Sequence, residues 1–275
     1  MQDTIDTNAG MPYLVALFSL AAVFFVLLLV LEKRHPYRTF PIQVQKNSFV
    51  TNTSVFLLNN LILTILKASS LFLVAEKFSG SGLLANMDDG ILKSLLAFAL
   101  FDLAIYGWHY AGHKLEWMWR FHKVHHSDKS FNVSTGIRFH VFDLLLEIIY
   151  KCVFVVVIGV NAYLILAIEI VELFFIFFHH ANIRLQIEPQ LSAWIITPSL
   201  HRTHHSTLRN EHDSNYGIVL AVWDKLFGTR LEHEPEQIGL NLMAAENVVQ
   251  LFSLAFITER QMKKILSLIP NNKKK

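Results

Sequence analysis

The sequence has little cysteine and little charge. It contains one cysteine, Cys152, so an internal disulfide framework and a cysteine-rich metal site are both excluded. Charged side chains make up 17% of the 275 residues against 53% hydrophobic ones, a balance typical of proteins that lie in a membrane. The net charge is only +2, and no long basic tract contains aromatic residues, so we expect no nucleic-acid partner.

The hydrophobic residues gather in runs that are long enough to cross a bilayer. The clearest run is 13–31, which we expect to be retained as a membrane anchor. Two further spans are predicted over 49–75 and 91–108, and the stretches 141–160 and 162–180 predict a helical hairpin. The first arm of this hairpin carries three charged residues, so we expect a tilted or incomplete span. The sequence therefore predicts an all-α integral membrane bundle of about four to five membrane segments.

Basic residues beside the spans predict how this bundle is oriented in the membrane. Lys33 and Arg34 follow the first span, which places its end on the cytoplasmic side. We expect the histidine-rich ends of the later spans on that cytoplasmic face, in the inner membrane if the protein is bacterial. Three regions are predicted: N-terminal membrane segments over 1–90, a catalytic region over 91–235, and an amphipathic basic tail over 236–275.

Three short histidine motifs stand at the ends of the predicted spans and in the loops that follow them. HYAGH is one, and HKVHH and HRTHH share the spacing H-x-x-H-H. Residues three or four apart lie on one face of a helix, so each motif presents several imidazoles together. A catalytic zinc takes three protein ligands and a structural zinc four, so eight imidazoles predict two metal ions. Imidazole suits zinc, copper, iron or nickel, so the ligands alone do not choose the metal. The eight ligands predicted are His109, His113, His122, His125, His126, His201, His204 and His205.

Two polar residues precede these ligands on the same predicted helix. Asp102 and Tyr106 lie seven and three residues before His109, on one helical stripe. An ionisable residue inside a span marks a functional site, and a carboxylate that accepts the far N–H of a ligating histidine fixes its tautomer. We therefore expect Asp102 and Tyr106 to support the metal ligands. The alternative is that Asp102 pairs with Lys93 or lines a polar seam between helices.

The order of the motifs resembles that of the fatty acid hydroxylase superfamily. The segments are HYAGH, WRFHKVHHSDKSFNVSTGIRFH, FFHHANIRL, TPSLHRTHHS and DSNYGIVLAVWDKLFGT, and they cover about 101–229. Within the superfamily they are similar to the sterol desaturase-type and alkylglycerol monooxygenase branches. The resemblance implies a non-haem di-iron centre that uses O2 as co-substrate. It further implies an external electron donor, either a protein or a reduced pterin, and hydroxylation or desaturation of a lipid C–H bond.

The resemblance also implies further site residues. His180 matches a family histidine, and because adjacent helical residues do not share a face, we expect His180 rather than His179 to bind metal. His140 matches a histidine of the sterol-type branches, and the alternative for it is a hydrogen-bonded core histidine. Three polar residues are expected to orient histidines or the terminal segment: Asn182, Asn215 and Asp224.

Two other classes of membrane protein use clustered or buried histidines. A divalent-metal transporter or zinc-binding membrane protein would place its ligands near the bilayer midplane along a pathway. A membrane haem protein would need isolated axial histidines deep in opposing helices. The clustering of motifs at span ends favours the oxygenase over both.

Overall fold

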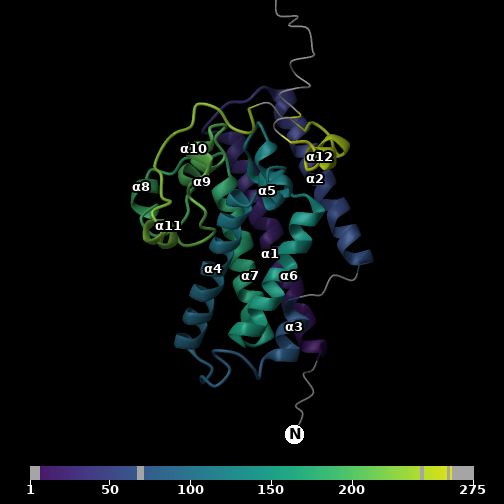
Figure 1. Ribbon diagram of the computed structural model, residues 1–275, viewed down its shortest axis with the longest axis vertical. Coiled ribbons are helices and arrows are strands. Elements are labelled where there is room, and N and C mark those ends of the chain that lie inside the picture. Colours follow the sequence, from purple (N-terminus) through teal and green to yellow (C-terminus); the bar gives the residue numbers. More distant parts are fainter. Residues whose placement is uncertain (1–6, 67–70, 242–244, 259–260, 262–275) are drawn as a thin grey trace, which may run out of the picture.

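The computed structural model describes residues 7–66, 71–241, 245–258 and 261, and within them every regular element is helical. Long helices stand side by side, and short helices and loops cover one end of them (Figure 1). We call this covering the cap; it comprises residues 115–140, 181–241 and 245–258. The prediction of an all-α membrane bundle with a histidine-rich cap is confirmed. The lysines expected to mark a basic tail (Lys263, Lys264 and Lys273 to Lys275) lie outside the described residues.

Six helices form the bundle: α1 (Thr7–Arg34), α2 (Ile42–Ile65), α3 (Leu71–Phe78), α4 (Ile91–Lys114), α6 (Val141–Ile158) and α7 (Ala162–His180). The helices of the cap are short: α5 (Glu116–His122), η1 (His125–Ser127), η2 (Val133–Ile137), α8 (Glu188–Leu191), α9 (Pro198–His204), α10 (Arg209–His212), α11 (Val222–Leu226) and α12 (Val248–Leu254).

Four of the described helices are long and apolar enough to cross a membrane. The segments are Val15–Arg34, Ile42–Ile65, Ile91–Lys114 and Ala162–His180. Helix α6 is not among them; with Asp143, Glu147 and Lys151 it is the charged hairpin arm.

The structure corrects two predicted boundaries. The second span begins at Ile42, directly after Pro41, and α3 is a separate helix rather than its continuation. Helix α4 runs six residues beyond Trp108, to Lys114, so HYAGH lies on the span itself. The reason is that α4 is still packed inside protein at this depth, where imidazoles find partners and need not end the helix.

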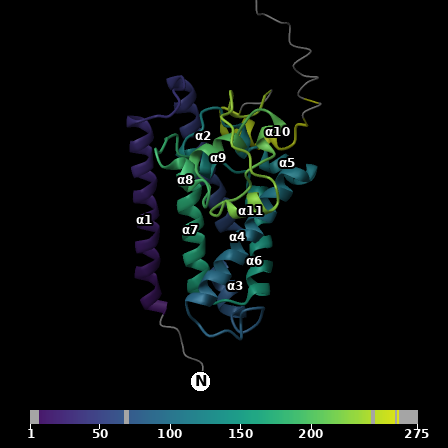
Figure 2. The same cartoon turned by 90° about the vertical axis from the view of Figure 1, so that its left-hand side faces the viewer.

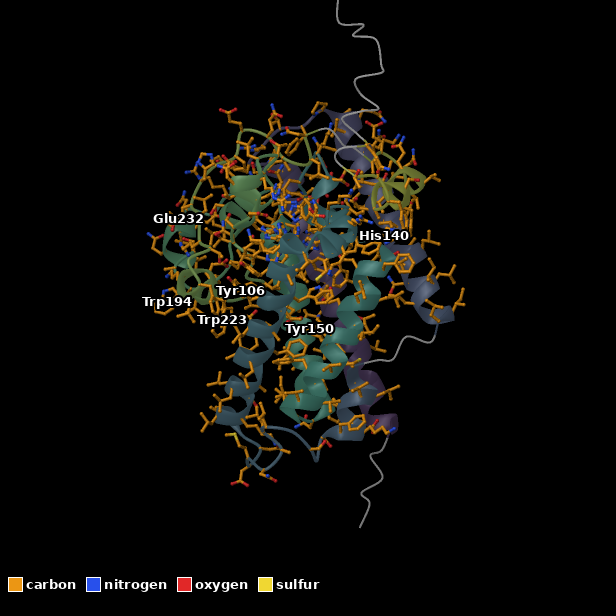
Figure 3. All side chains as sticks on the ribbon, viewed as in Figure 1. Tyr106, His140, Tyr150, Trp194, Trp223 and Glu232 are labelled. Atoms are coloured by element: carbon orange, nitrogen blue, oxygen red, sulfur yellow. The ribbon has the colours of Figure 1, made fainter. Side chains whose placement is uncertain are left out.

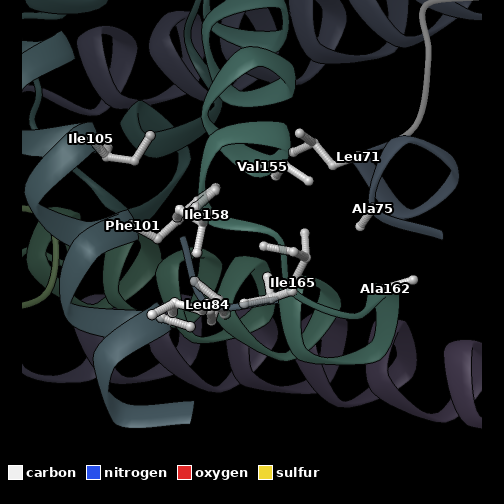
Figure 4. Packing of buried hydrophobic residues seen from close by; sticks show 12 residues of the cluster. Leu71, Ala75, Leu84, Phe101, Ile105, Val155, Ile158, Ala162 and Ile165 are labelled. Atoms are coloured by element: carbon white, nitrogen blue, oxygen red, sulfur yellow. The ribbon is translucent and has the colours of Figure 1, made fainter. Parts of the chain in front are cut away.

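Apolar packing holds the end of the bundle that is opposite the cap (Figure 4). Small residues such as Ala75, Ala97 and Ala162 let α3, α4 and α7 approach closely, which is how helices associate in a membrane. Two glycines with positive φ, Gly82 and Gly159, complete this end. A Cβ on Gly82 would lie 2.6 Å from the backbone nitrogen of Gly159, so no larger residue fits there.

Helix α1 packs along α7 on one side of the bundle (Figure 2). Phe24 and Phe25 of α1 meet Phe174 and Phe177 of α7, with ring centroids 4.8 and 4.9 Å apart. The basic end of α1 therefore stands at the cap end of the bundle.

Polar side chains join α2 to the cap. Asn52 of α2 donates to Asp128 at 2.8 Å and accepts from the buried guanidinium of Arg138 at 2.8 Å. Asn59 is buried and donates to the carbonyl of Phe139. Asn60, the next residue, is exposed and donates within its own helix. These bonds fix the segment that follows HKVHH.

Candidate metal centre

Nine histidines converge in two adjoining groups where α4 and α7 enter the cap. In each group the ligand nitrogens lie within 4.8 Å of one another, and all nine side chains are buried. In Figure 3 side-chain nitrogen atoms gather at this level inside the upper part of the bundle. The first group is His109, His113, His122, His126 and His204, and the second is His125, His180, His201 and His205.

Each H-x-x-H-H motif contributes to both groups. His122 and His126 belong to the first group, whereas His125 between them belongs to the second. The chain changes from α5 to the 3-10 helix η1 here, so consecutive histidines point to opposite sides. In α9 the arrangement is reversed, because His204 joins the first group and its two partners join the second. The two groups are therefore held side by side, with the rings of His126 and His205 stacked at 4.4 Å.

Hydrogen bonds at Nδ1 fix the tautomer and direction of several rings. His109 donates from Nδ1 to the carbonyl of Tyr216 at 2.8 Å, His204 to the carbonyl of Ser214 at 2.6 Å, and His180 to the carbonyl of Ile176 at 2.7 Å. A carbonyl can only accept, so the proton lies on Nδ1 and the lone pair on Nε2. These Nε2 atoms face into the groups as metal-binding donors.

The inward nitrogens lack partners that would satisfy them without a cation. Nε2 of His109, His122 and His204 is buried with no hydrogen-bond partner. Nε2 of His113 lies 3.1 Å from Nε2 of His126, so without a cation one of these two nitrogens must carry a proton to form a hydrogen bond. Two nitrogens bound at about 2.1 Å to one ion and at right angles to each other would be about 3.0 Å apart. The donor set therefore fits two metal ions, one in each group.

Electrostatics keep these imidazoles neutral. Burial lowers the pKa of His125, His126, His201, His204 and His205 well below 6.5, and neighbouring imidazoles lower it further. Neutral imidazole is the form that binds metal, so the site is ready for a cation at neutral pH.

Comparison with known proteins places this geometry in a family. Residues 94–229 match the fatty acid hydroxylase family model, and this range contains all nine histidines. The chain belongs to the fatty acid hydroxylase family. No solved structure gives a significant match to this chain.

Curated members of the family are similar over the same region. Human alkylglycerol monooxygenase is 32% identical over 161 residues, which are 58% of this chain and 35% of that protein. Ornithine lipid hydroxylase OlsE of Rhizobium tropici is 34% identical over 136 residues, 49% of this chain and 40% of that protein. Rat cholesterol 25-hydroxylase is 29% identical over 146 residues, 49% of this chain and 45% of that protein. The matched region thus spans less than half of each relative.

The structure brings together nine of the ten histidines predicted as metal ligands. His180 enters the second group, while His179 is buried beside it with its ring 3.9 Å from that of His201. Among the described residues, His140 belongs to neither of the two histidine groups. It accepts at Nδ1 from the backbone N–H of Phe142 and caps α6, on the side of the bundle shown in Figure 3. Its position as a helix cap, with its ring against Phe252, explains why it does not turn toward the other histidines.

The expectation that Asp102 accepts from a ligating histidine is wrong. Its carboxylate accepts from the backbone N–H groups of Val219 and Leu220 and from the indole N–H of Trp223, at 2.8 to 3.2 Å. Asp102 is fully buried and binds the returning loop of the cap to α4. His109 instead donates from Nδ1 to the carbonyl of Tyr216, which faces that nitrogen.

Two of the other predicted polar residues act on the segment after α10. Asp224 accepts from the backbone N–H groups of Tyr216 and Gly217, and so fixes the carbonyl that His109 uses. Burial raises the pKa of Asp224. Tyr106 bonds to Thr229 at 2.9 Å, and Thr229 in turn donates to Asp224.

The remaining two contact no histidine directly. Asn215, at φ +52°, donates to the carbonyls of Leu200 and Leu231 and so anchors the terminal segment near α9. Asn182 exchanges hydrogen bonds with the backbone of Arg38 and ties α7 to the connection between α1 and α2.

Sequence reasoning missed the carboxylates that do face histidines. Asp143 accepts from Nδ1 of His122 at 3.1 Å, and Asp213 lies 3.4 Å from Nδ1 of His113. His212, which is not among the predicted ligands, lies close enough to His113 and Asp213 to complete a third candidate group. The only sequence signal for Asp143 is a lone acid in the first turn of a hairpin arm, which more often marks a helix N-terminus.

Proposed function

We propose that this protein is an O2-dependent di-iron membrane enzyme that hydroxylates or desaturates a lipid C–H bond. The observation that carries the proposal is the pair of adjoining buried groups, five and four histidines, that contain no carboxylate. Iron accepts imidazole ligands, and ions held by neutral donors in an apolar bundle are strongly electrophilic. Family membership supports the choice of iron and O2 over a transport role.

With two iron ions bound, O2 and two electrons supply an oxidant able to cleave an unactivated C–H bond. Hydroxylation consumes O2, two electrons and two protons and yields the alcohol and water. Desaturation uses the same O2, two electrons and two protons, removes two hydrogen atoms from adjacent carbons, and yields the alkene and two waters. The chain's own residues hold the ions, exclude bulk water by burial, and position the substrate carbon.

Backbone groups do much of this positioning. The carbonyls of Tyr216 and Ser214 hold His109 and His204, and Asp143 holds His122, so that Nε2 of each ring points inward. Ile105 and Trp108 of α4 and Ile176 of α7 line part of the space beside the histidines with apolar side chains. The placement of the substrate carbon against these walls would decide between hydroxylation and desaturation.

The electron donor is proposed to be external, either a protein or a reduced pterin, because the sequence has no flavin, haem or ferredoxin motif. We place the site on the cytoplasmic face, since Lys33 and Arg34 end α1 at the cap end of the bundle. The substrate is proposed to be a lipid because three relatives carry the names alkylglycerol monooxygenase, ornithine lipid hydroxylase and cholesterol 25-hydroxylase.

The test is Mössbauer spectroscopy of protein expressed with enriched iron, purified anaerobically in detergent and then exposed to O2. We expect coupled iron at about two per chain, a change of its spectrum on O2 exposure, and an altered lipid profile in the expressing cells. A His109→Ala, His180→Ala double variant is the matched control and should lack the coupled signal. Tightly held zinc that iron cannot displace, with no response to O2, would contradict the proposal and favour a zinc-binding membrane protein.

A further inference from the structure

A small chamber of about 60 Å³ adjoins both histidine groups on the membrane side. Histidines of the metal centre form one wall, and apolar residues of α4, α7 and the cap form others. The remaining wall is charged, which is unusual inside a membrane bundle, where ionisable side chains as a rule serve a function. Its charged residues are Glu147 and Lys151 of α6 and Glu172 of α7.

The charged wall is an ion cluster with one lysine and two carboxylates. Lys151 lies 3.0 Å from Oε2 of Glu172 and 3.1 Å from Oε1 of Glu147. Glu172 is 2% exposed, whereas the side chain of Glu147 is 24% exposed. The cluster therefore reaches from the edge of the bundle to the chamber.

The second oxygen of Glu172 has no hydrogen-bond partner. Oε1 is buried, lies on a residue that lines the chamber, and is satisfied by no group of the described chain. A buried carboxylate oxygen left without a partner costs about 1–3 kcal/mol or more. A purely structural bridge between α6 and α7 would be complete with Oε2 and Lys151 alone. The free oxygen is a hydrogen-bond acceptor on a side chain that lines the chamber.

The charges of the chamber define its occupant. The volume of about 60 Å³ leaves room for a small polar group beside them. An ammonium has three donors, and Lys151 uses two of them on the carboxylates. A hydroxyl group can donate to Oε1 of Glu172 and accept from Lys151 at the same time. An unsubstituted hydrocarbon chain would leave both unsatisfied.

We infer that Glu172, with Lys151, binds a hydroxyl group of the lipid substrate within a few bonds of the carbon that is oxidised. This inference rests on the proposed function, and it narrows the substrate class to lipids that carry a hydroxyl close to the reactive carbon. Glu172 and Lys151 determine specificity, while the histidines on the opposite wall hold the ions.

The test compares binding of two lipid probes that differ only in hydroxyl groups. 1-O-hexadecylglycerol and its di-O-methyl ether would be titrated calorimetrically into the purified, metal-loaded protein in detergent, anaerobically and without a reductant. We expect the wild type to bind the hydroxylated probe at least 10-fold more tightly than the ether. Glu172→Gln should reduce this preference to less than threefold. Equal binding of the two probes by the wild type, or binding of neither, would overturn the inference.

Glu169 provides the matched control, because it lies one turn before Glu172 on α7 and does not line the chamber. Glu169→Gln makes the same chemical change and should keep the 10-fold preference, with metal content unchanged in both variants. A preference that survives in Glu172→Gln, or is lost equally in Glu169→Gln, contradicts the assignment.

An activity measurement keeps the two proposals apart. The same proteins would be supplied with reductant and O2, and the products of each probe analysed by mass spectrometry. Product from both probes at equal rates overturns the inference and leaves the oxygenase intact. A binding preference that depends on Glu172, without turnover of any lipid, supports the hydroxyl site and counts against the proposed reaction.

Discussion

Oδ2 of Asp143 accepts from Nδ1 of His122 at 3.1 Å, and both side chains are buried. This contact joins the first turn of α6 to the last residue of α5, so the hairpin that carries His180 also orients a ligand of the other group. A carboxylate behind a ligating imidazole fixes its tautomer and raises its basicity.

Asp143→Asn should therefore weaken metal binding in the first group. The neutral amide accepts a weaker hydrogen bond from His122, and loss of such a partner reduces metal affinity about 10–100-fold. Competition with a chelator, followed by elemental analysis, measures the change. Asp89→Asn is the control, since Asp89 pairs with Lys93 at the far end of α4. Equal chelator sensitivity of the two variants would show that Asp143 does not support the ligand.

Single substitutions should remove the two metals separately. His204→Ala takes one ligand from the five-histidine group and His180→Ala one from the four-histidine group, so each is expected to lose about one of two ions. His140→Ala should retain both, because His140 caps α6 and belongs to neither group. Metal content per chain after gel filtration checks all three variants. Loss of an ion in His140→Ala would show that His140 supports a metal ion in addition to capping α6.

Asp102→Ala should destabilise the protein rather than alter a ligand. The change leaves the N–H groups of Val219, Leu220 and Trp223 without their acceptor. We expect a loss of about 3 kcal/mol, because each buried donor left unpaired costs about 1–3 kcal/mol. The thermal midpoint should fall on the order of 10 °C. Trp223→Phe removes one of the three donors and leaves the other two bonded to Asp102, so it should destabilise the protein less than Asp102→Ala. A larger loss of stability in Trp223→Phe would contradict this expectation.

The metal-free protein should lose stability as the pH falls below about 6.5. In the folded cap the pKa of five histidines is well below 6.5, whereas the unfolded chain takes up protons near 6.5. The unfolded state then binds more protons in acid, so the free energy of unfolding decreases as pH decreases through that range. Thermal unfolding of chelated protein between pH 8 and 5, followed by near-ultraviolet circular dichroism, checks the sign. A midpoint that stays constant or rises on acidification would show that the fold does not lower the pKa of these imidazoles.

Local patterns in the sequence predicted most of the long helices and eight of the nine histidines that converge in the structure. A span needs a long apolar run, and a metal group needs imidazoles at helical spacing, so HYAGH, HKVHH and HRTHH are visible without a fold. The second group contains His180 and not His179, and the choice of His180 as the metal ligand stays a prediction.

Only the tertiary structure decided how these ligands are divided and supported. His125 and His126 are neighbours in sequence but enter different groups, because α5 gives way to η1 between them and each ring meets histidines from distant helices. Asp102 has the spacing of a supporting residue, yet it binds the cap loop, while Asp143 supports His122 from a helix that begins 19 residues further along the chain. Such hydrogen bonds depend on where elements far apart in sequence come to rest, which spacing along one helix does not encode.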